Sequence, residues 1–355
     1  MFKQKECYNN NPKYTHTPTS LEMNINFILN RYGTHRSIVD GGGGATEFLG
    51  YMLAYKLSTV YTVKVFNLEP SQRIDNIEYR YLPVELEEEA RSAGNSVFII
   101  LDYIDFPIGL CHINKNHKYI LWCHNYLEGD WQKYMRIRFS LEDVNTFYSQ
   151  NNITTVAVSQ FHGRNISSIF PDMKVVPIYN SIHPELFPRL QDTPYDRNKM
   201  IFASRWSKGL EKVIGIGIEY YKRNRDFKLV LIKPNYCKWD PDMSYLPFIE
   251  KRGNIPSKEE YSALLQSCLA VFSTSFPETF GCVFAEALHL GVPVICDKSI
   301  ESGVHEIVEK DYCCDFNDHE QVIRLIETFR KNRPKVSLGT RFYDTSVVKD
   351  WEALF

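Results

Sequence analysis

The sequence has no long hydrophobic run and no strong excess of charge of either sign. No apolar stretch approaches the roughly 20 residues that cross a bilayer, and the polar N-terminal stretch lacks the apolar core of a signal peptide. The 41 basic and 43 acidic residues leave a formal net charge of -2, which argues against a globally basic binder of nucleic acid. We therefore expect a cytoplasmic protein with no transmembrane segment and no nucleic-acid partner, whereas peripheral membrane contact stays open.

Zinc-ribbon and thioredoxin-type motifs are also absent. The nine cysteines have no CxxC spacing, and a chain without a secretion signal is expected to keep its thiols reduced. Hydrophobic residues make up 44% and charged residues 24% of the chain, which is the composition of a globular protein. At roughly 150 residues per domain, the 355 residues predict about two domains.

Short apolar strands alternate with helical or loop-like segments in the first half. Residues 1–20 are expected to form an irregular arm, and residues 21–183 a Rossmann-like domain with a parallel sheet covered on both faces. A run of glycines at 41–44 precedes a periodic segment at 46–57, which predicts a strand, a glycine loop and a helix. The predicted strands are Ile25–Leu29, Thr62–Phe66, Ser96–Leu101, Lys118–Cys123 and Thr154–Val158.

The same alternation restarts after a proline-rich stretch, which predicts a linker at 184–199 and a second Rossmann-like domain at 200–335. Ligands of such sheets bind beyond the carboxyl ends of the strands, so function is expected in the loops there. The predicted strands are Met200–Ala203, Lys228–Ile232, Leu269–Ser273 and Val292–Cys296, and the predicted helices are 209–223, 257–267 and 281–290.

Two of these loops carry charged residues suited to a nucleotide. Arg205 and Lys208 follow a strand at the start of a helix, where two cations and free helix amides can hold a diphosphate. A solvated helix start is the alternative. Glu278 lies in the next such loop, and Glu286 lies in an apolar helix where its carboxylate needs a partner such as a ribose diol. A structural role for either glutamate stays open.

The glycine run is less specific. Glycine lets backbone amides approach a ligand, but a full GxGxxG motif is missing. Asn67 also occupies the position at which dinucleotide-binding domains have an acidic residue that binds the ribose. A tight turn without a ligand is the alternative.

The stretch PETFGCVFAEALHLGVPV, with Glu278 and Glu286 in an E-x7-E arrangement, resembles the retaining GT-B glycosyltransferases of the family-4-like group. FASRWSKGL resembles their phosphate loop in a shortened form, and ESGVHEIVE, which contains Glu306, resembles the small-residue loop that follows. VVPIYNSIHPELF resembles the segment that closes the first domain, and ILWCHN places His124 where the group often has an active-site histidine.

The resemblance implies a GT-B fold with two Rossmann-like domains facing a cleft and a C-terminal helix, at 336–355, that returns to the first domain. It implies that Glu278, His124, Arg205 and Lys208 serve catalysis. The implied donor site comprises Arg205, Lys208, Asn254, Ile255, Glu278, Phe280, Gly281 and Glu286, and the implied acceptor side comprises Gly43, Gly44, Asp102 and His124.

The implied reaction moves a sugar from a UDP- or GDP-sugar to a glycan or other hydroxyl acceptor by front-face substitution, with no cofactor or metal required. Asp240-Pro241-Asp242 has the DxD spacing of metal-dependent glycosyltransferases, but an ordinary turn is the simpler interpretation. A nucleotide-sugar 2-epimerase of the same fold and a catalytically silent glycan-binding protein are the alternatives. His124 could also be a buried structural histidine.

Overall fold

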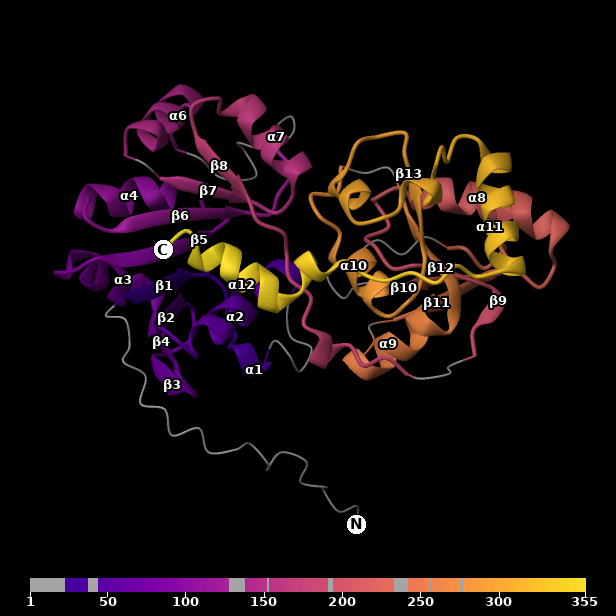
Figure 1. Ribbon diagram of the computed structural model, residues 1–355, viewed down its shortest axis with the longest axis horizontal. Coiled ribbons are helices and arrows are strands. Elements are labelled where there is room, and N and C mark those ends of the chain that lie inside the picture. The colour runs from indigo at the N-terminus through magenta and orange to yellow at the C-terminus, as the bar shows by residue number, and fades with distance from the viewer. Residues whose placement is uncertain are drawn as a thin grey trace, which may run out of the picture.

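The computed structural model describes residues 23–37, 44–127, 138–151, 153–190, 194–232, 242–253, 255, 257–274 and 277–355. Two α/β halves lie side by side, the first in indigo to magenta and the second in orange (Figure 1). The predicted arm at 1–20 lies outside the described residues.

The first half contains an eight-stranded sheet with the order β3-β4-β2-β1-β5-β6-β7-β8. All pairs are parallel except β3 with β4. Every residue of the central strand β5 is buried, which explains its continuous apolar sequence. The strands are β1 (Asn24–Ile28), β2 (Thr62–Asn67), β3 (Gln72–Ile74), β4 (Ile77–Tyr81), β5 (Ser96–Leu101), β6 (Lys118–Cys123), β7 (Thr154–Ala157) and β8 (Lys174–Pro177). The helices are α1 (His35–Ser37), α2 (Ala45–Leu57), α3 (Leu82–Arg91), α4 (Asp105–Ile113), α6 (Leu141–Gln150) and α7 (Gln160–Ile169).

The second half contains a six-stranded parallel sheet with the order β11-β10-β9-β12-β13-β14. The strands are β9 (Asp196–Phe202), β10 (Lys228–Ile232), β11 (Ile249–Arg252), β12 (Cys268–Ser273), β13 (Val294–Asp297) and β14 (Cys313–Cys314). The helices are α8 (Leu210–Arg223), α9 (Lys258–Gln266), α10 (Cys282–His289), α11 (His319–Lys331) and α12 (Asp344–Glu352). Short 3-10 helices are η2 (Pro184–Leu186), η3 (Gly303–Glu306), η4 (Lys310–Tyr312) and η5 (Thr340–Phe342).

The predicted strands are all present, with small shifts at their ends. Five strands were not among those predicted from the residue pattern: β3, β4, β8, β11 and β14. They lie at or next to the sheet edges and are short or partly exposed, so they give no long apolar run. β9 begins at Asp196, which pairs with Cys268 of β12, before the expected Met200, because its first four residues are polar and gave no apolar signal. The domain boundaries predicted at 183 and 199 remain predictions.

The C-terminal helix packs on the first half, as predicted. Trp351 of α12 is fully buried and its ring lies 4.8 Å from that of Trp122 of β6. Lys56 of α2 contacts Asp344 at 2.6 Å, and Tyr343 pairs with Ile182 in an isolated parallel bridge. Figure 1 shows α12, in yellow, beside α2 in the first half, whereas α11 lies in the second half. This segment therefore ties the second half back to the first.

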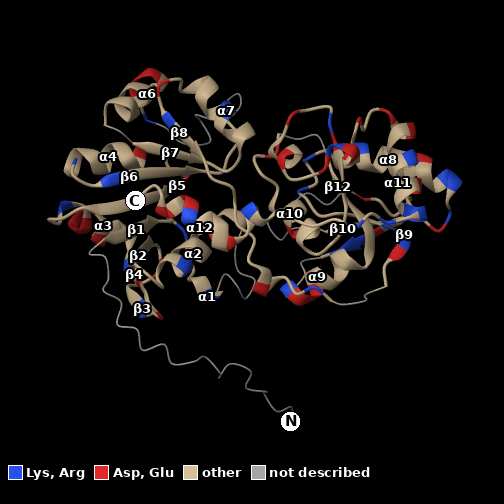
Figure 2. Cartoon of the chain, in the orientation of Figure 1, with Lys and Arg blue, Asp and Glu red and all other residues tan. Residues whose placement is uncertain are grey.

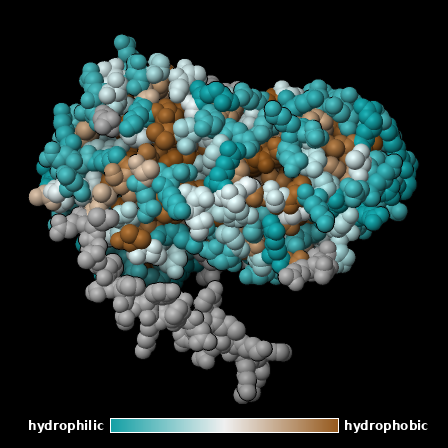
Figure 3. Space-filling view, in the orientation of Figure 1, coloured by the Kyte–Doolittle hydropathy of each residue, from teal (hydrophilic) through white to brown (hydrophobic). Residues whose placement is uncertain are grey.

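The visible surface is mixed in character. Basic and acidic residues are interspersed over both halves (Figure 2), and hydrophobic residues form separate patches on a mostly hydrophilic face (Figure 3). Within the described ranges, no helix has the length and hydropathy needed to cross a membrane.

Candidate active site

Two helix starts meet at the carboxyl ends of β9 and β12 in the second half. Gly209 precedes α8 with φ of 87° and Gly281 precedes α10 with φ of 93°, and both lie in the left-handed region that favours glycine. A Cβ on Gly281 would lie 2.6 Å from Phe284 and 2.9 Å from Val304, so a side chain would not fit there. The exposed amides of the two helix starts form an environment suited to anionic groups.

Lys208 and Glu278 form an ion pair between these helix starts. Their side chains are 27% and 20% exposed, so both still reach solvent. The backbone amide of Lys208 donates to Arg205 O at 2.9 Å in a tight turn, and the Thr274 hydroxyl donates to Lys208 O. Arg205 is exposed at the same turn. The structure thus brings together the two loops that the sequence predicted to act together.

Glu286 lies on α10, beside Lys258 and Tyr261 of α9. Burial raises the pKa of its carboxyl, and Lys258 and Tyr261 lower it by less. The thiol of Cys282 has its pKa raised to about 12 by burial, then by Glu286 and Glu278, so both glutamates lie near that thiol. Lys258 and Tyr261 were missed from the sequence, because their contact with Glu286 joins two helices far apart in the chain.

Of the remaining residues predicted to bind the donor, the structure describes two, Phe280 and Ile255. Phe280 is buried and packs against Tyr179 and Phe342, with ring centroids 6.2 and 6.0 Å away. Ile255 follows the end of β11 and packs on the main core. Asn254 lies outside the described residues. Phe280 therefore supports the loop that carries Glu278 through packing.

Asp102 and His124 lie together at the carboxyl ends of β5 and β6 in the first half. Asp102 has φ of 58°, and its carboxylate accepts a 2.7 Å hydrogen bond from the His124 amide. The His124 ring lies 4.6 Å from the Trp122 ring, tilted by 45°, and its ring nitrogens have no hydrogen-bond partner within the described part of the chain. Burial raises the pKa of Asp102 to about 7 and lowers the pKa of His124 to about 3. The imidazole is therefore neutral at pH 7.

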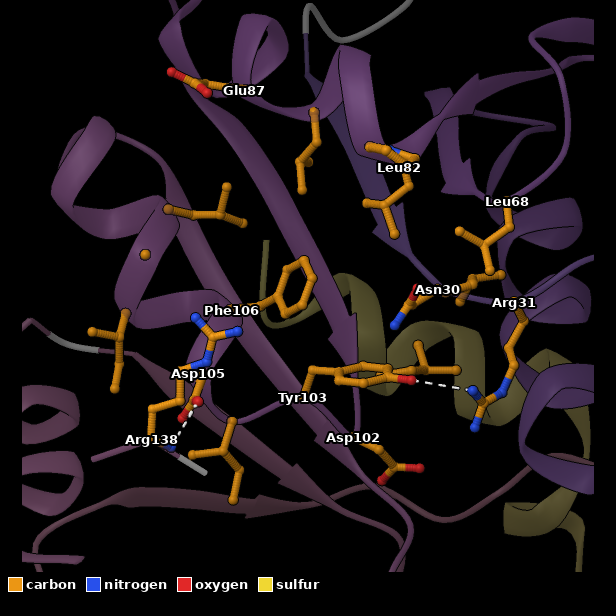
Figure 4. Close-up of a pocket in the computed structure, with 18 of the residues that line it drawn as sticks. Asn30, Arg31, Leu68, Leu82, Glu87, Asp102, Tyr103, Asp105, Phe106 and Arg138 are labelled. Carbon is orange, nitrogen blue, oxygen red and sulfur yellow. Dashed lines mark hydrogen bonds between the residues drawn. The ribbon is translucent and has the colours of Figure 1, made fainter. Parts of the chain in front are cut away.

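A cavity of about 1350 Å³ opens beside Asp102. In Figure 4, Asp102, Tyr103 and Arg31 lie toward one end, Glu87 lies at the opposite end, and Phe106 lies between them. Arg31 donates to Tyr103 at 3.2 Å and pairs with Glu47 of α2 at 2.9 Å. Many of the other lining side chains are aliphatic: Leu29, Leu68, Leu82, Leu86, Ile104, Ile108 and Ile113. The cavity therefore has a charged end next to Asp102 and an apolar wall beyond it.

The glycine loop lies next to this charged end. Gly44 precedes α2, and a Cβ there would lie 2.6 Å from the Glu47 carboxylate. Gly43 lies outside the described residues. Asn67 is fully buried and donates to Gly33 O at 2.8 Å, so it holds the preceding loop in place.

Direct hydrogen bonds join the donor loop to the first half. The Thr279 hydroxyl donates to His124 O at 2.8 Å, and the Ser159 hydroxyl donates to Thr279 O at 2.5 Å. The amide of Gly303 donates to Glu278 O at 2.8 Å from the other side. The predicted catalytic residues Glu278 and His124 are thus brought to one interface by Thr279, a residue that sequence reasoning did not select.

The predicted turn at Asp240-Pro241-Asp242 is described only at its last residue. The Asp242 carboxylate accepts a 2.9 Å hydrogen bond from the Ser244 amide, as in an ordinary Asx turn.

Comparisons with known proteins give one family and one fold. Residues 251–341 match the family described as glycosyl transferases group 1. No curated protein matches the sequence significantly.

Solved structures match over most of the chain. Sucrose-phosphate synthase from Thermosynechococcus elongatus is 14% identical with a TM-score of 0.65, over 94% of this chain and 95% of that one. A UDP-forming α,α-trehalose-phosphate synthase from Burkholderia vietnamiensis is 11% identical with a TM-score of 0.64, over 94% and 95%. The pneumococcal O-GlcNAc transferase GtfA, in complex with UDP and GlcNAc, is 13% identical with a TM-score of 0.51, over 75% of this chain and 57% of that one.

These similarities agree with the observed architecture, in which two parallel sheets carry helix starts at facing strand ends and a C-terminal helix crosses back. Residues 251–341 thus match the glycosyl transferases group 1, and the whole chain has the GT-B fold, which together indicate a glycosyltransferase.

Proposed function

We propose that the protein is a retaining glycosyltransferase that moves a sugar from a nucleotide-diphosphate sugar to an acceptor hydroxyl. Residues 200–335 would hold the donor and residues 21–183 the acceptor. The observation that carries the proposal is the Lys208–Glu278 ion pair, which lies between the starts of α8 and α10 and is joined to His124 through Thr279.

The donor roles follow from charge and position. The starts of α8 and α10, with Lys208 and Arg205, suit the diphosphate, because cations and helix amides stabilise negative charge. Glu286 would accept hydrogen bonds from the ribose hydroxyls, and Glu278 from hydroxyls of the donor sugar. When the donor binds, Lys208 would exchange part of its contact with Glu278 for phosphate oxygens.

The acceptor roles follow from the cavity in the first half. The acceptor hydroxyl would approach past Asp102 and His124, while the rest of the acceptor would occupy the cavity lined by Phe106 and the aliphatic side chains. A neutral His124 can exchange hydrogen bonds with a sugar hydroxyl without adding charge near the anomeric carbon.

The reaction itself would be a front-face substitution with retention. Negative charge develops on the leaving diphosphate as its bond to the anomeric carbon breaks, and fixed cations and helix amides stabilise it in the closed site. The departing phosphate oxygen would take the proton from the acceptor hydroxyl. In this scheme no metal ion is needed for the charge to be stabilised.

Two of the similar structures guide the choice of nucleotide. One is named as UDP-forming and the other was solved with UDP and GlcNAc. UDP-sugars are therefore the first donors to test, followed by GDP- and ADP-sugars.

A thermal-shift panel with these nucleotides and their sugars tests the proposal. A ligand at about 100 times its dissociation constant adds roughly 2.7 kcal/mol of stability. We expect one nucleotide class to raise the melting temperature, and Lys208→Ala to weaken its binding by about 10- to 100-fold, the equivalent of one charge-assisted hydrogen bond.

Lys222→Ala is the matched control, because Lys222 lies at the far end of α8 and, among the described residues, pairs only with the partly exposed Glu219 at 2.6 Å. Equal binding by the wild type and Lys208→Ala would contradict the phosphate role. Conversion of one nucleotide sugar into another without an acceptor would instead indicate an epimerase.

A further inference from the structure

A cluster of metal-ligating side chains lies outside the residues used above, at the edge of the second sheet. Cys296 of β13 and Cys313 of β14 are directly paired positions on neighbouring parallel strands. His305 lies on η3, in the crossover between these two strands. One ligand atom from each of the three residues lies within 4.8 Å of the other two.

The chemistry of the three groups favours a soft divalent metal. Cys296 is 1% exposed, and Cys313 is partly buried. Cysteine sulfur and histidine nitrogen are the ligands that zinc takes in proteins.

A backbone hydrogen bond orients the histidine. His305 Nε2 lies 3.0 Å from Asp297 O, and a carbonyl oxygen can only accept, so Nε2 carries the proton and Nδ1 carries the lone pair. Metal-bound histidines commonly donate their second ring nitrogen to a carbonyl in this way. This contact is independent of the proximity of the three side chains.

We propose that Cys296, His305 and Cys313 bind one zinc ion, with water in the fourth position. Tetrahedral zinc with two sulfur ligands and one nitrogen ligand places these atoms about 3.5 to 3.8 Å apart, which small side-chain rotations would achieve here. Binding would release two thiol protons to solvent, one from each cysteine, and leave a metal bound to two thiolates, one neutral imidazole and one water.

A second cluster of this kind among the described residues is less suitable. His183, Glu185 and Asp344 also lie within 4.8 Å of one another. However, the Lys56 ammonium contacts Glu185 at 2.9 Å and Asp344 at 2.6 Å, so a cationic side chain already neutralises these carboxylates.

Zinc at the first cluster would fix the crossover of residues 298–312 at both ends and in the middle. This crossover carries Glu301 and Glu306, which contact Arg164 and the start of α7 in the first half. The ion would therefore support the wall of the cleft without touching the residues proposed for transfer.

The test is zinc binding by the full-length, reduced protein. We expect one zinc per chain to remain after desalting, measured by native mass spectrometry and by competition with a chromophoric chelator. Cobalt substituted for zinc should give a thiolate-to-metal charge-transfer band, which a site without cysteine ligands does not give.

Cys313→Ser and His305→Gln are the test variants, because both residues are partly exposed and their replacement is less disruptive than that of Cys296. Each should weaken zinc binding by more than about tenfold, since even the loss of an outer-shell partner costs 10- to 100-fold. Cys314→Ser is the control, because it changes the adjacent thiol and leaves the cluster intact.

Absence of bound zinc in the wild type would overturn the proposal, as would equal zinc affinity in wild type and Cys313→Ser. Formation of a Cys296–Cys313 disulfide in place of zinc binding would also overturn it. The result is independent of donor binding, so it separates this site from the proposed transfer.

Discussion

Burial determines the protonation state of two histidines beside the cleft. Burial lowers the pKa of His124 to about 3 and that of His162 to about 4. His162 Nδ1 accepts from the Val158 amide at 3.3 Å, while Nε2 lies 3.0 Å from Asn125 O. This arrangement requires a neutral ring, because a protonated Nδ1 could no longer accept.

These two histidines predict a loss of stability in acid. Between about pH 6.5 and 4 the unfolded chain binds protons that the folded His124 and His162 do not, so the free energy of unfolding falls as the pH falls. Asp102 acts in the opposite direction, because its raised pKa favours the folded state at low pH. Urea unfolding from pH 7 to 4 should show a net loss of stability, and His162→Gln should reduce the slope of the free energy of unfolding against pH by on the order of 1 kcal/mol per pH unit.

Exposed His112 provides the control for this measurement. His112→Gln should keep the wild-type slope. A wild-type slope in His162→Gln would show that this ring is protonated in the folded protein.

Glu286 allows a second prediction at the scale of single residues. Partial burial raises the pKa of its carboxyl, so removal of the charge should not reduce folding stability. Glu286→Gln should weaken binding of the nucleotide by about tenfold if the carboxylate accepts from the ribose, because hydrogen bonds to charged groups exceed neutral ones by roughly that amount. Isothermal titration calorimetry checks this, with Glu259→Gln on the exposed face of α9 as control.

Among the elements, the start of α10 is the most constrained by its glycine. Gly281→Ala adds a Cβ that meets Phe284 and Val304 at a backbone angle unfavourable for alanine. We expect a loss of about 2 to 4 kcal/mol in the free energy of unfolding, from backbone strain plus overpacking. Gly94→Ala separates the two terms, because Gly94 has φ of 123° and nothing within 4 Å of the added Cβ. An equal loss of unfolding free energy in the two variants would show that the contacts with Phe284 and Val304 add no cost to the backbone strain at Gly281.

The elements also show how far the sequence was informative. Strands such as β5 and β12 were predictable because both faces are buried, which leaves an uninterrupted apolar run. The polar edge strand β11 gave no such signal. The contact of Thr279 with His124 could not be predicted, because it depends on how two separately folded sheets face each other.

At the scale of the whole molecule, the two halves are joined by backbone and charged contacts around Glu306. The Glu306 carboxylate accepts from the amides of Gln160 and Phe161 at 3.1 and 2.6 Å, and from the Tyr179 hydroxyl at 2.8 Å. It lies at the start of α7, where the helix dipole favours a negative charge. A residue of the second half thus caps a helix of the first.

Replacing Glu306 should therefore loosen the closed arrangement without removing a donor contact. In Glu306→Ala, two helix amides lose their carboxylate partner. This should weaken the association of the two halves by about 2 kcal/mol. The radius of gyration from small-angle scattering should increase. The kcat for transfer should fall several-fold, whereas the affinity for the nucleotide should change less, because donor and acceptor groups meet only when the halves are closed. Glu301→Ala is the matched control: its ion pair with Arg164 spans the same halves, but both side chains are more than 60% exposed, and such pairs contribute little. An unchanged radius and kcat in Glu306→Ala would show that the contacts of Thr279 and α12 hold the halves together without this cap.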